Sequence, residues 1–176
     1  MNQKRLIDSL ERFADVLPAV VRDVSDNDAR WRPPPPPDGA WSILEIVTHL
    51  ADEEVEDFRC RLELTLRDPG LAWPPIDPEA AAVERRYNEG DLDEAVGRFV
   101  AARRESIRWL NGLGDPAWSG AHRHPSGELR GGDLLAAWVA HDAMHLRQIS
   151  KRFFQLSVRD AGEYVTGYAG SWPRGE

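Results

Sequence analysis

The sequence has 176 residues, which is enough for one domain with a sizeable hydrophobic core. Hydrophobic residues account for 41% of it and charged residues for 30%, a balance typical of water-soluble globular proteins and unlike that of disordered chains. The formal net charge of -8 repels phosphate groups, so we expect neither nucleic acid nor an anionic membrane surface as a partner.

Three further features bear on the cellular compartment. No apolar run approaches the roughly 20 residues that are needed to cross a bilayer, and the N-terminal segment MNQKRLIDSLERF lacks the apolar centre of a signal peptide. The single cysteine, Cys60, cannot form a disulfide within the chain. We therefore expect a cytoplasmic protein in a reducing environment.

The first two predicted helices are separated by a proline-rich connection. Apolar residues recur every three or four positions over residues 3–24, which predicts an amphipathic helix there. Five consecutive prolines at positions 33–37 predict a stiff, extended spacer. A second helix is predicted over residues 42–67, because Ser42 and Glu45 have the spacing of a capping box, in which each side chain accepts from the other residue's backbone N–H.

Two more helices are predicted in the second half of the chain. The third covers residues 91–112 with Asp91 as its N-cap, and the fourth covers residues 133–156 with Asp133 as its N-cap. No segment shows sustained alternation of polar and apolar residues, so a hairpin in a connection is the only sheet that we expect.

Four long amphipathic helices without strands predict an all-α fold, a four-helix bundle that forms a single domain over residues 1–176. The connections are longer than the few residues that join the helices of a simple up-down bundle. We therefore expect long crossover connections between the helices.

Two histidines stand four residues apart in the fourth predicted helix, within the segment AAWVAHDAMHLRQIS. His141 and His145 project from the same face of that helix, so their imidazoles can bind one metal ion. The same spacing also arises by chance, and then the two residues are polar side chains at the edge of the core. The spacing alone leaves both interpretations open.

His49 is a third candidate, in the second predicted helix. Glu45 and Glu53 flank it on the same face, with Asp52 and Glu56 beside them, and apolar residues of the helix lie on the opposite side. This polar stripe is either a solvated acidic face or the wall of a cleft that supplies one more nitrogen ligand. The residues of this helix do not decide between the two.

The fourth helix favours the cleft. His141, His145, Gln148 and Arg152 form a polar row along the edge of its apolar face. Asp142 projects toward the middle of that apolar face, where an unpaired carboxylate would be unfavourable. Its expected partner is the N–H of a metal-bound imidazole or of a tryptophan, and the alternatives are an arginine or a role in capping a loop.

These segments together resemble the DinB-like superfamily, which includes YfiT-type metal-dependent hydrolases and transferases. The resemblance extends over most of the chain and rests on Trp41, the His49 segment WSILEIVTHLADEE, the stretch HPSGELRGGDLL and the stretch HDAMHLRQI. It implies a four-helix bundle with a long crossover and one divalent transition metal ion held by three histidines. Carried onto this sequence, the ligands are His49, His141 and His145, and the expected metal is zinc or nickel.

The resemblance also implies an activity on a small-molecule substrate. Relatives with assigned chemistry use this site for thiol-dependent sulfur transfer or isomerisation, or for hydrolysis, so a low-molecular-weight thiol is a candidate second cofactor. Relatives often form homodimers, and the resemblance implies a homodimer here. In this chain, Glu53 is the candidate acid/base or water-orienting residue, and Gln148 is the candidate for orienting a ligand or polarising the substrate.

The alternative is a non-catalytic helical bundle, whose metal is structural or which only binds a small molecule. A di-iron carboxylate bundle fits poorly, because it needs a glutamate three residues before a histidine, and none of the three histidines has one. His122 and His124 lie in the Pro- and Gly-rich connection before the fourth helix, and we expect them to be ordinary loop residues.

Overall fold

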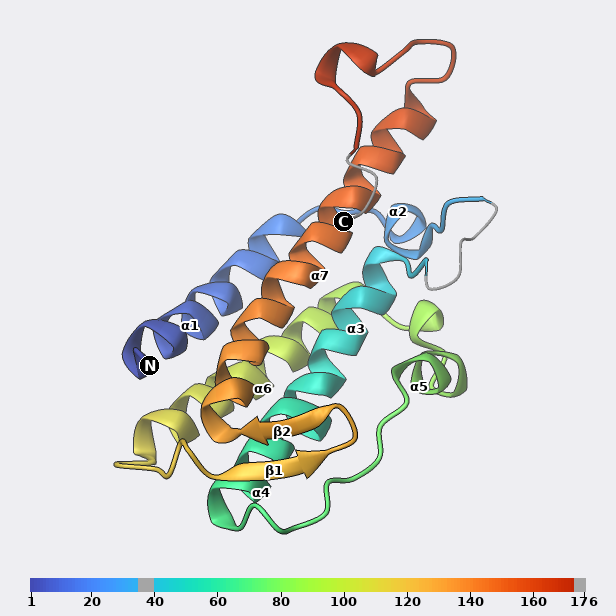
Figure 1. The fold of residues 1–176 in the computed structure, drawn as a ribbon. Coiled ribbons are helices and arrows are strands. Elements are labelled where there is room, and N and C mark those ends of the chain that lie inside the picture. The colour runs from blue at the N-terminus through green and yellow to red at the C-terminus, as the bar shows by residue number, and fades with distance from the viewer. Residues whose placement is uncertain (35–39, 173–176) are drawn as a thin grey trace.

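The structure is a computed structural model of the chain, and it describes residues 1–34 and 40–172. Four long helical segments lie side by side (Figure 1): α1 (Gln3–Val20), the segment that begins with α3 (Ile43–Glu53), α6 (Leu92–Gly112) and α7 (Gly131–Asp160). The prediction of an all-α four-helix bundle is confirmed. Positions 35–37 of the predicted proline spacer lie outside the described residues.

Each long helix contacts two neighbours in the bundle. α6 packs against α1 and α3, and α7 packs against the same two helices. α1 and α3 therefore occupy opposite corners, as do α6 and α7. The connections from α1 to α3 and from α6 to α7 cross the bundle, which agrees with the long crossovers that were predicted. In the described part of the chain, no helix is long and apolar enough to cross a membrane.

The second long segment is helical over its predicted range, but its winding changes in the middle. It begins with the predicted capping box, and α3 leads without a break into η1 (Glu54–Arg59), a π-helical stretch, and then into α4 (Cys60–Arg67). The backbone bonds of a π-helix span one residue more than those of an α-helix, so the wider turn changes which faces the following side chains occupy. Here Glu54 is buried and Val55 is exposed.

Short elements lie in the connections and after the last helix. They are α2 (Asp26–Arg30), α5 (Pro78–Glu84), η2 (Tyr87–Glu89), β1 (Ala121–His124), β2 (Gly127–Arg130) and η3 (Gly167–Ala169). β1 and β2 pair antiparallel, with Ala121 opposite Arg130, and form the only sheet among residues 1–34 and 40–172. The hairpin that the sequence allowed in a connection is therefore present, just before α7.

Three helix ends differ from the prediction, and one of them is the end of α7, which continues to Asp160 and not only to residue 156. α1 ends at Val20 and not at residue 24, because the chain turns at Asp23, which has a positive φ of 60°. α7 begins at Gly131 and not at Asp133, whose carboxylate accepts a hydrogen bond from the Arg130 backbone N–H at 3.0 Å. Asp133 therefore stabilises the helix from within its first turn and is not its N-cap.

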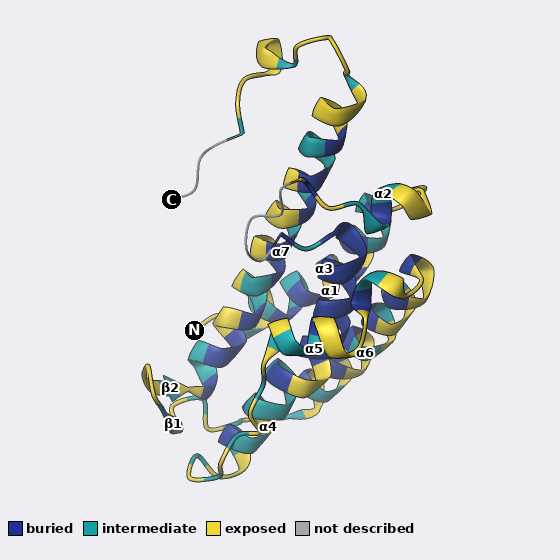
Figure 2. Ribbon diagram, turned by 90° about the vertical axis from the view of Figure 1, so that its right-hand side faces the viewer, coloured by how far each residue is buried: buried dark blue, intermediate teal, exposed yellow. Residues whose placement is uncertain are grey.

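The core consists of two apolar clusters toward opposite ends of the bundle. One includes Leu17, Ile46 and Phe99, and the other includes Leu10 and Trp138. α3 is buried along its whole length, as Figure 2 shows, because other elements surround it. Where the two clusters meet, a guanidinium group lies 4.8 Å from the centre of the Phe99 ring and 5.8 Å from that of Trp138.

That guanidinium belongs to Arg103, which is buried and binds two carboxylates. Its terminal nitrogens donate to Asp142 at 2.7 and 2.8 Å, and its Nε donates to Glu54 at 2.8 Å. It also donates to the Leu10 carbonyl at 3.2 Å, and the Trp138 indole N–H donates to Glu54 at 3.0 Å. The partner of Asp142 is thus an arginine and not an imidazole or a tryptophan. These bonds join α1, η1, α6 and α7.

We expect Arg103→Met to lower the free energy of unfolding by about 3–5 kcal/mol, because it leaves two buried carboxylates without a cation. Arg104→Met removes the exposed guanidinium of the next residue and should change that free energy by no more than about 0.5 kcal/mol. Urea unfolding followed by circular dichroism measures both. Equal stabilities of the two variants would contradict the structural role of Arg103.

Candidate metal centre

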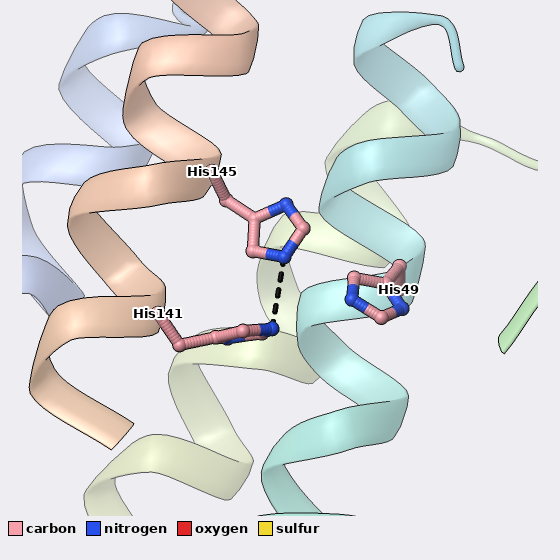
Figure 3. Close-up of side chains that lie close together, drawn as sticks. All are labelled: His49, His141 and His145. Carbon is pink, nitrogen blue, oxygen red and sulfur yellow. Dashed lines mark hydrogen bonds between the residues drawn. The ribbon is translucent and has the colours of Figure 1, made fainter. Parts of the chain in front are cut away.

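Three histidines converge between two neighbouring helices. His49 lies on α3, and His141 and His145 lie on α7, which packs against α3 (Figure 3). One ring nitrogen from each lies within 4.8 Å of the other two, and the Nε2 atoms of His141 and His145 are 2.9 Å apart. The structure therefore brings together all three histidines that the sequence singled out.

The polar stripe around His49 is not a solvated face except at Glu56, which is exposed. His49 is 4% exposed, and Glu45, Asp52 and Glu53 are buried with it. α7 covers α3 at the histidines, and α5 and η2 also contact α3. Of the two interpretations of this stripe, the structure agrees with the inward-facing one.

Gln148 fixes the tautomer of His145. Its side-chain oxygen lies 2.8 Å from Nδ1 of His145, and because an amide oxygen can only accept, Nδ1 carries the proton. Nε2 of His145 is then unprotonated, and it faces His141 (Figure 3). Metal-binding histidines are typically oriented in this way, by a hydrogen bond from the ring nitrogen that does not bind the metal.

Burial keeps the three imidazoles neutral. Desolvation lowers the pKa of His49 to about 3, that of His141 to about 2 and that of His145 to about 4. At His49 and His141 the neighbouring rings lower the pKa further, because a second positive charge would be repelled. Neutral imidazole is the form that binds a metal ion.

Aromatic rings enclose part of the cluster. The centre of the Trp41 ring lies 4.7 Å from that of His49, and the centre of the Phe58 ring lies 4.8 Å from that of His141. Trp41 comes just before the capping box of α3, and Phe58 comes from η1. Their apolar surfaces reduce the polarity around the imidazoles, which strengthens electrostatic interactions at the site.

Glu53 lies beside the histidine cluster, one helical turn after His49. Its Oε1 atom is 4.0 Å from Nδ1 of His49. Burial and the neighbouring Asp57 together raise the pKa of the Glu53 carboxyl to about 8, and Arg61 opposes the shift. Asp57 and Arg61, which sequence reasoning missed, form an ion pair at 2.8 Å. The sequence does indicate that they lie on the same helix face, because both continue the four-residue spacing that begins at His49 and Glu53.

The sequence matches a known family along most of its length. Residues 9–149 match the profile of the DinB superfamily. The chain belongs to the DinB superfamily. Among solved structures it is similar to YfiT from Bacillus subtilis, with a TM-score of 0.77 and 20% identity over 88% of this chain and 87% of that one. YfiT is described as a probable metal-dependent hydrolase with an unusual four-helix bundle topology. A comparison with curated proteins gives no match.

The donor set of this DinB-superfamily chain fits a divalent transition metal ion. Such ions bind imidazole nitrogen at about 2.0–2.1 Å, so two nitrogens on one ion lie at most about 4.2 Å apart. The ligand atoms found here all lie within 4.8 Å of one another, and small side-chain rotations would bring them into that range. Magnesium and calcium prefer oxygen ligands and fit three imidazoles poorly.

The other two histidines of this DinB-superfamily chain lie on the hairpin. His122 stacks on Trp73 with 4.0 Å between the ring centres, and its Nδ1 lies 3.0 Å from the Pro69 carbonyl oxygen. His124 Nδ1 lies 2.7 Å from the Ser126 hydroxyl oxygen. Neither belongs to the histidine cluster, which is the only potential metal-binding group found in the described part of the chain.

The lowered imidazole pKa values should make the metal-free protein sensitive to acid. Below about pH 6.5, where a histidine of the unfolded chain takes up a proton, the native imidazoles remain neutral. The unfolded state then binds more protons, so the free energy of unfolding falls as the pH falls, by up to about 1.4 kcal/mol per pH unit for each histidine. His141→Gln should flatten this dependence in chelator-treated protein, measured by urea unfolding at several pH values between about 6.5 and 4.5.

His124→Gln is the matched control and should keep the wild-type slope. Glu53 contributes to the pH dependence of the free energy of unfolding in the opposite direction, because its raised pKa makes the native state take up a proton as the pH falls below about 8. This contribution is the same in both variants, so it cancels when their slopes are compared. An unchanged slope in His141→Gln would show that His141 is not held neutral by burial.

Proposed function

We propose that this chain is a metal-dependent hydrolase of a small-molecule substrate, in which His49, His141 and His145 bind one divalent transition metal ion. The observation that carries the proposal is the convergence of two buried imidazoles, those of His49 and His145, and the half-buried imidazole of His141 beside the buried carboxyl of Glu53, a group that suits acid/base catalysis. The description of YfiT, which shares the fold, as a probable metal-dependent hydrolase supports the same conclusion.

Zinc and nickel are the metals that we propose, because both accept imidazole nitrogen ligands. Three protein ligands are typical of catalytic zinc, whereas structural zinc usually has four. When bound, the ion supplies a Lewis acid that activates water or polarises a carbonyl oxygen.

The side chains around the histidines supply the other functions that hydrolysis needs. In its ionised form, Glu53 accepts a proton from the attacking water and returns it to the leaving group, a role that its position 4.0 Å from His49 suits. Gln148 holds the His145 ring through Nδ1, so it positions a ligand and does not touch the substrate. Trp41 and Phe58 exclude bulk water from the imidazoles.

Thiol-dependent sulfur transfer would use the same imidazoles with a low-molecular-weight thiol as co-substrate. A thiol has a pKa of about 8.5, far below the value of about 15.7 for water, so sulfur transfer depends less on a protein base. The buried carboxyl beside His49 therefore favours hydrolysis.

The metal ligands can be tested one at a time. His49→Ala, His141→Ala and His145→Ala should each abolish stoichiometric metal binding, because two imidazoles hold an ion far less tightly than three. Elemental analysis of the dialysed protein gives the metal content per chain, and His124→Ala should leave that content unchanged. A His49→Ala protein with a full complement of metal would refute this ligand set.

The role of Glu53 can be tested with zinc- or nickel-loaded protein and a panel of small esters, amides and thiol-transfer substrates. Glu53→Gln should lower kcat for hydrolysis by about 100-fold or more and leave the metal content unchanged, because it removes the acid/base group. Glu63→Gln, an exposed position on α4, is the control and should keep full activity. Sulfur transfer without hydrolysis in the wild type would make the protein a transferase.

A further inference from the structure

A cavity of about 310 Å³ lies between the α3–η1 junction and the segment from Pro75 to Tyr87, which contains α5. Its volume is within the range of roughly 300–1,000 Å³ that is typical of small-molecule pockets. Glu53 forms part of its wall and also lies 4.0 Å from His49. The cavity therefore lies next to the histidine cluster, with the Glu53 side chain between them, and none of the three histidines is among the residues that line it.

The two walls of this cavity differ in chemistry. The wall on the α5 side combines an apolar part, formed by Ile76, Ala80 and Ala81, with the charged residues Asp77, Glu84 and Arg85. The wall formed by α3 and η1 carries the carboxyl groups of Asp52, Glu53 and Glu56. A ligand that fits both walls has an apolar body and a polar group at one end.

The charges of the lining favour a cationic ligand over an anionic one. Arg85 is the one basic residue of the lining, and it already binds Asp52 at 2.6 Å and Glu56 at 2.8 and 3.0 Å. Glu84 also lines the cavity, and within the residues that the structure describes it forms no ion pair. An entering anion would be repelled by the carboxylates, and the charge of Arg85 is already paired. A positively charged amine would be attracted by the same carboxylates.

The α5 segment is anchored, so the cavity exists before a ligand binds. Tyr87 donates to Asp52 at 2.6 Å, and Arg85 donates to the same carboxylate. Arg86, between them, adopts a left-handed conformation with φ of 52°, and this turn allows both neighbours to reach one carboxylate. A preformed pocket loses less conformational entropy when it binds a ligand.

We propose that this cavity is the substrate entrance of the metal centre and that it selects a small molecule with a compact apolar body and a positively charged amine. The inference rests on the proposed function, because it takes the histidine cluster as the place of reaction. The apolar body lies against Ala80 and Ala81, and the amine lies near the carboxylate of Glu84.

Three probes of similar shape test the charge selectivity. Benzylamine, benzyl alcohol and benzoate share one ring and differ in charge, and isothermal titration of zinc-loaded protein compares their affinities. We expect benzylamine to bind most tightly and benzoate most weakly. Binding of benzoate as tight as that of benzylamine would overturn the proposal.

Matched variants test the location. Ala81→Leu fills the apolar wall and should weaken benzylamine binding by about tenfold or more, whereas Val83→Leu on the exposed side of the same helix should not change it. Glu84→Gln should weaken it by about three- to fivefold, and Glu79→Gln, which is outside the cavity, should leave it unchanged. Undiminished binding to Ala81→Leu would place the amine elsewhere and overturn the proposal.

Cobalt-loaded protein separates this inference from the proposed function. Paramagnetic cobalt bound by the three histidines should broaden the NMR signals of benzylamine in the cavity, relative to zinc-loaded protein. If the histidines bind cobalt and no broadening occurs, the entrance proposal fails while the metal centre stands. If the protein binds no metal at all, the proposed function fails, and the entrance role fails with it.

Discussion

The hydrogen bonds of Arg103 determine how the helices that carry the histidines meet. Asp142 follows His141 directly in sequence, and Glu54 follows Glu53, so both carboxylates that bind Arg103 are neighbours of residues at the site. A shift of α7 by one residue relative to α3 and η1 would break these bonds and separate the imidazoles. Few other arrangements would satisfy so many buried charged groups at once. The register of the site is therefore set by charges at the centre of the bundle.

Burial also determines the protonation states of the site. The desolvation that keeps the imidazoles neutral raises the pKa of Glu53, because an apolar environment disfavours the charged form of both kinds of group. The result is a polar cluster with little charge of its own inside an apolar bundle. One physical cause thus keeps the imidazoles neutral and raises the pKa of the carboxyl beside them.

The helical periodicity of the sequence predicted the bundle and the pair His141 and His145, because spacing along a helix is a local property. It could not decide whether His49 was solvated, since that depends on which elements cover α3. An arginine was only an alternative partner for Asp142 in the sequence analysis, and Arg103 was not identified, although it stands four residues from both Phe99 and Ile107, on the apolar side of its helix. An arginine in that line indicates a buried ion pair. The π-helical stretch was missed because its residues do not differ in type from those of an α-helix.

The π-helical winding of η1 decides which face of α4 meets the core. Because a π-helical turn holds about one residue more than an α-helical turn, η1 orients α4 much as an α-helical stretch one residue shorter would. α-Helical winding of the same residues would instead rotate α4 by roughly 100° relative to α3, and Leu62, which is fully buried, would turn away from the core. The wider turn and its extra residue therefore compensate each other: the loss of both together would keep the two halves facing as they do, whereas the loss of one alone would change which faces are inside the protein.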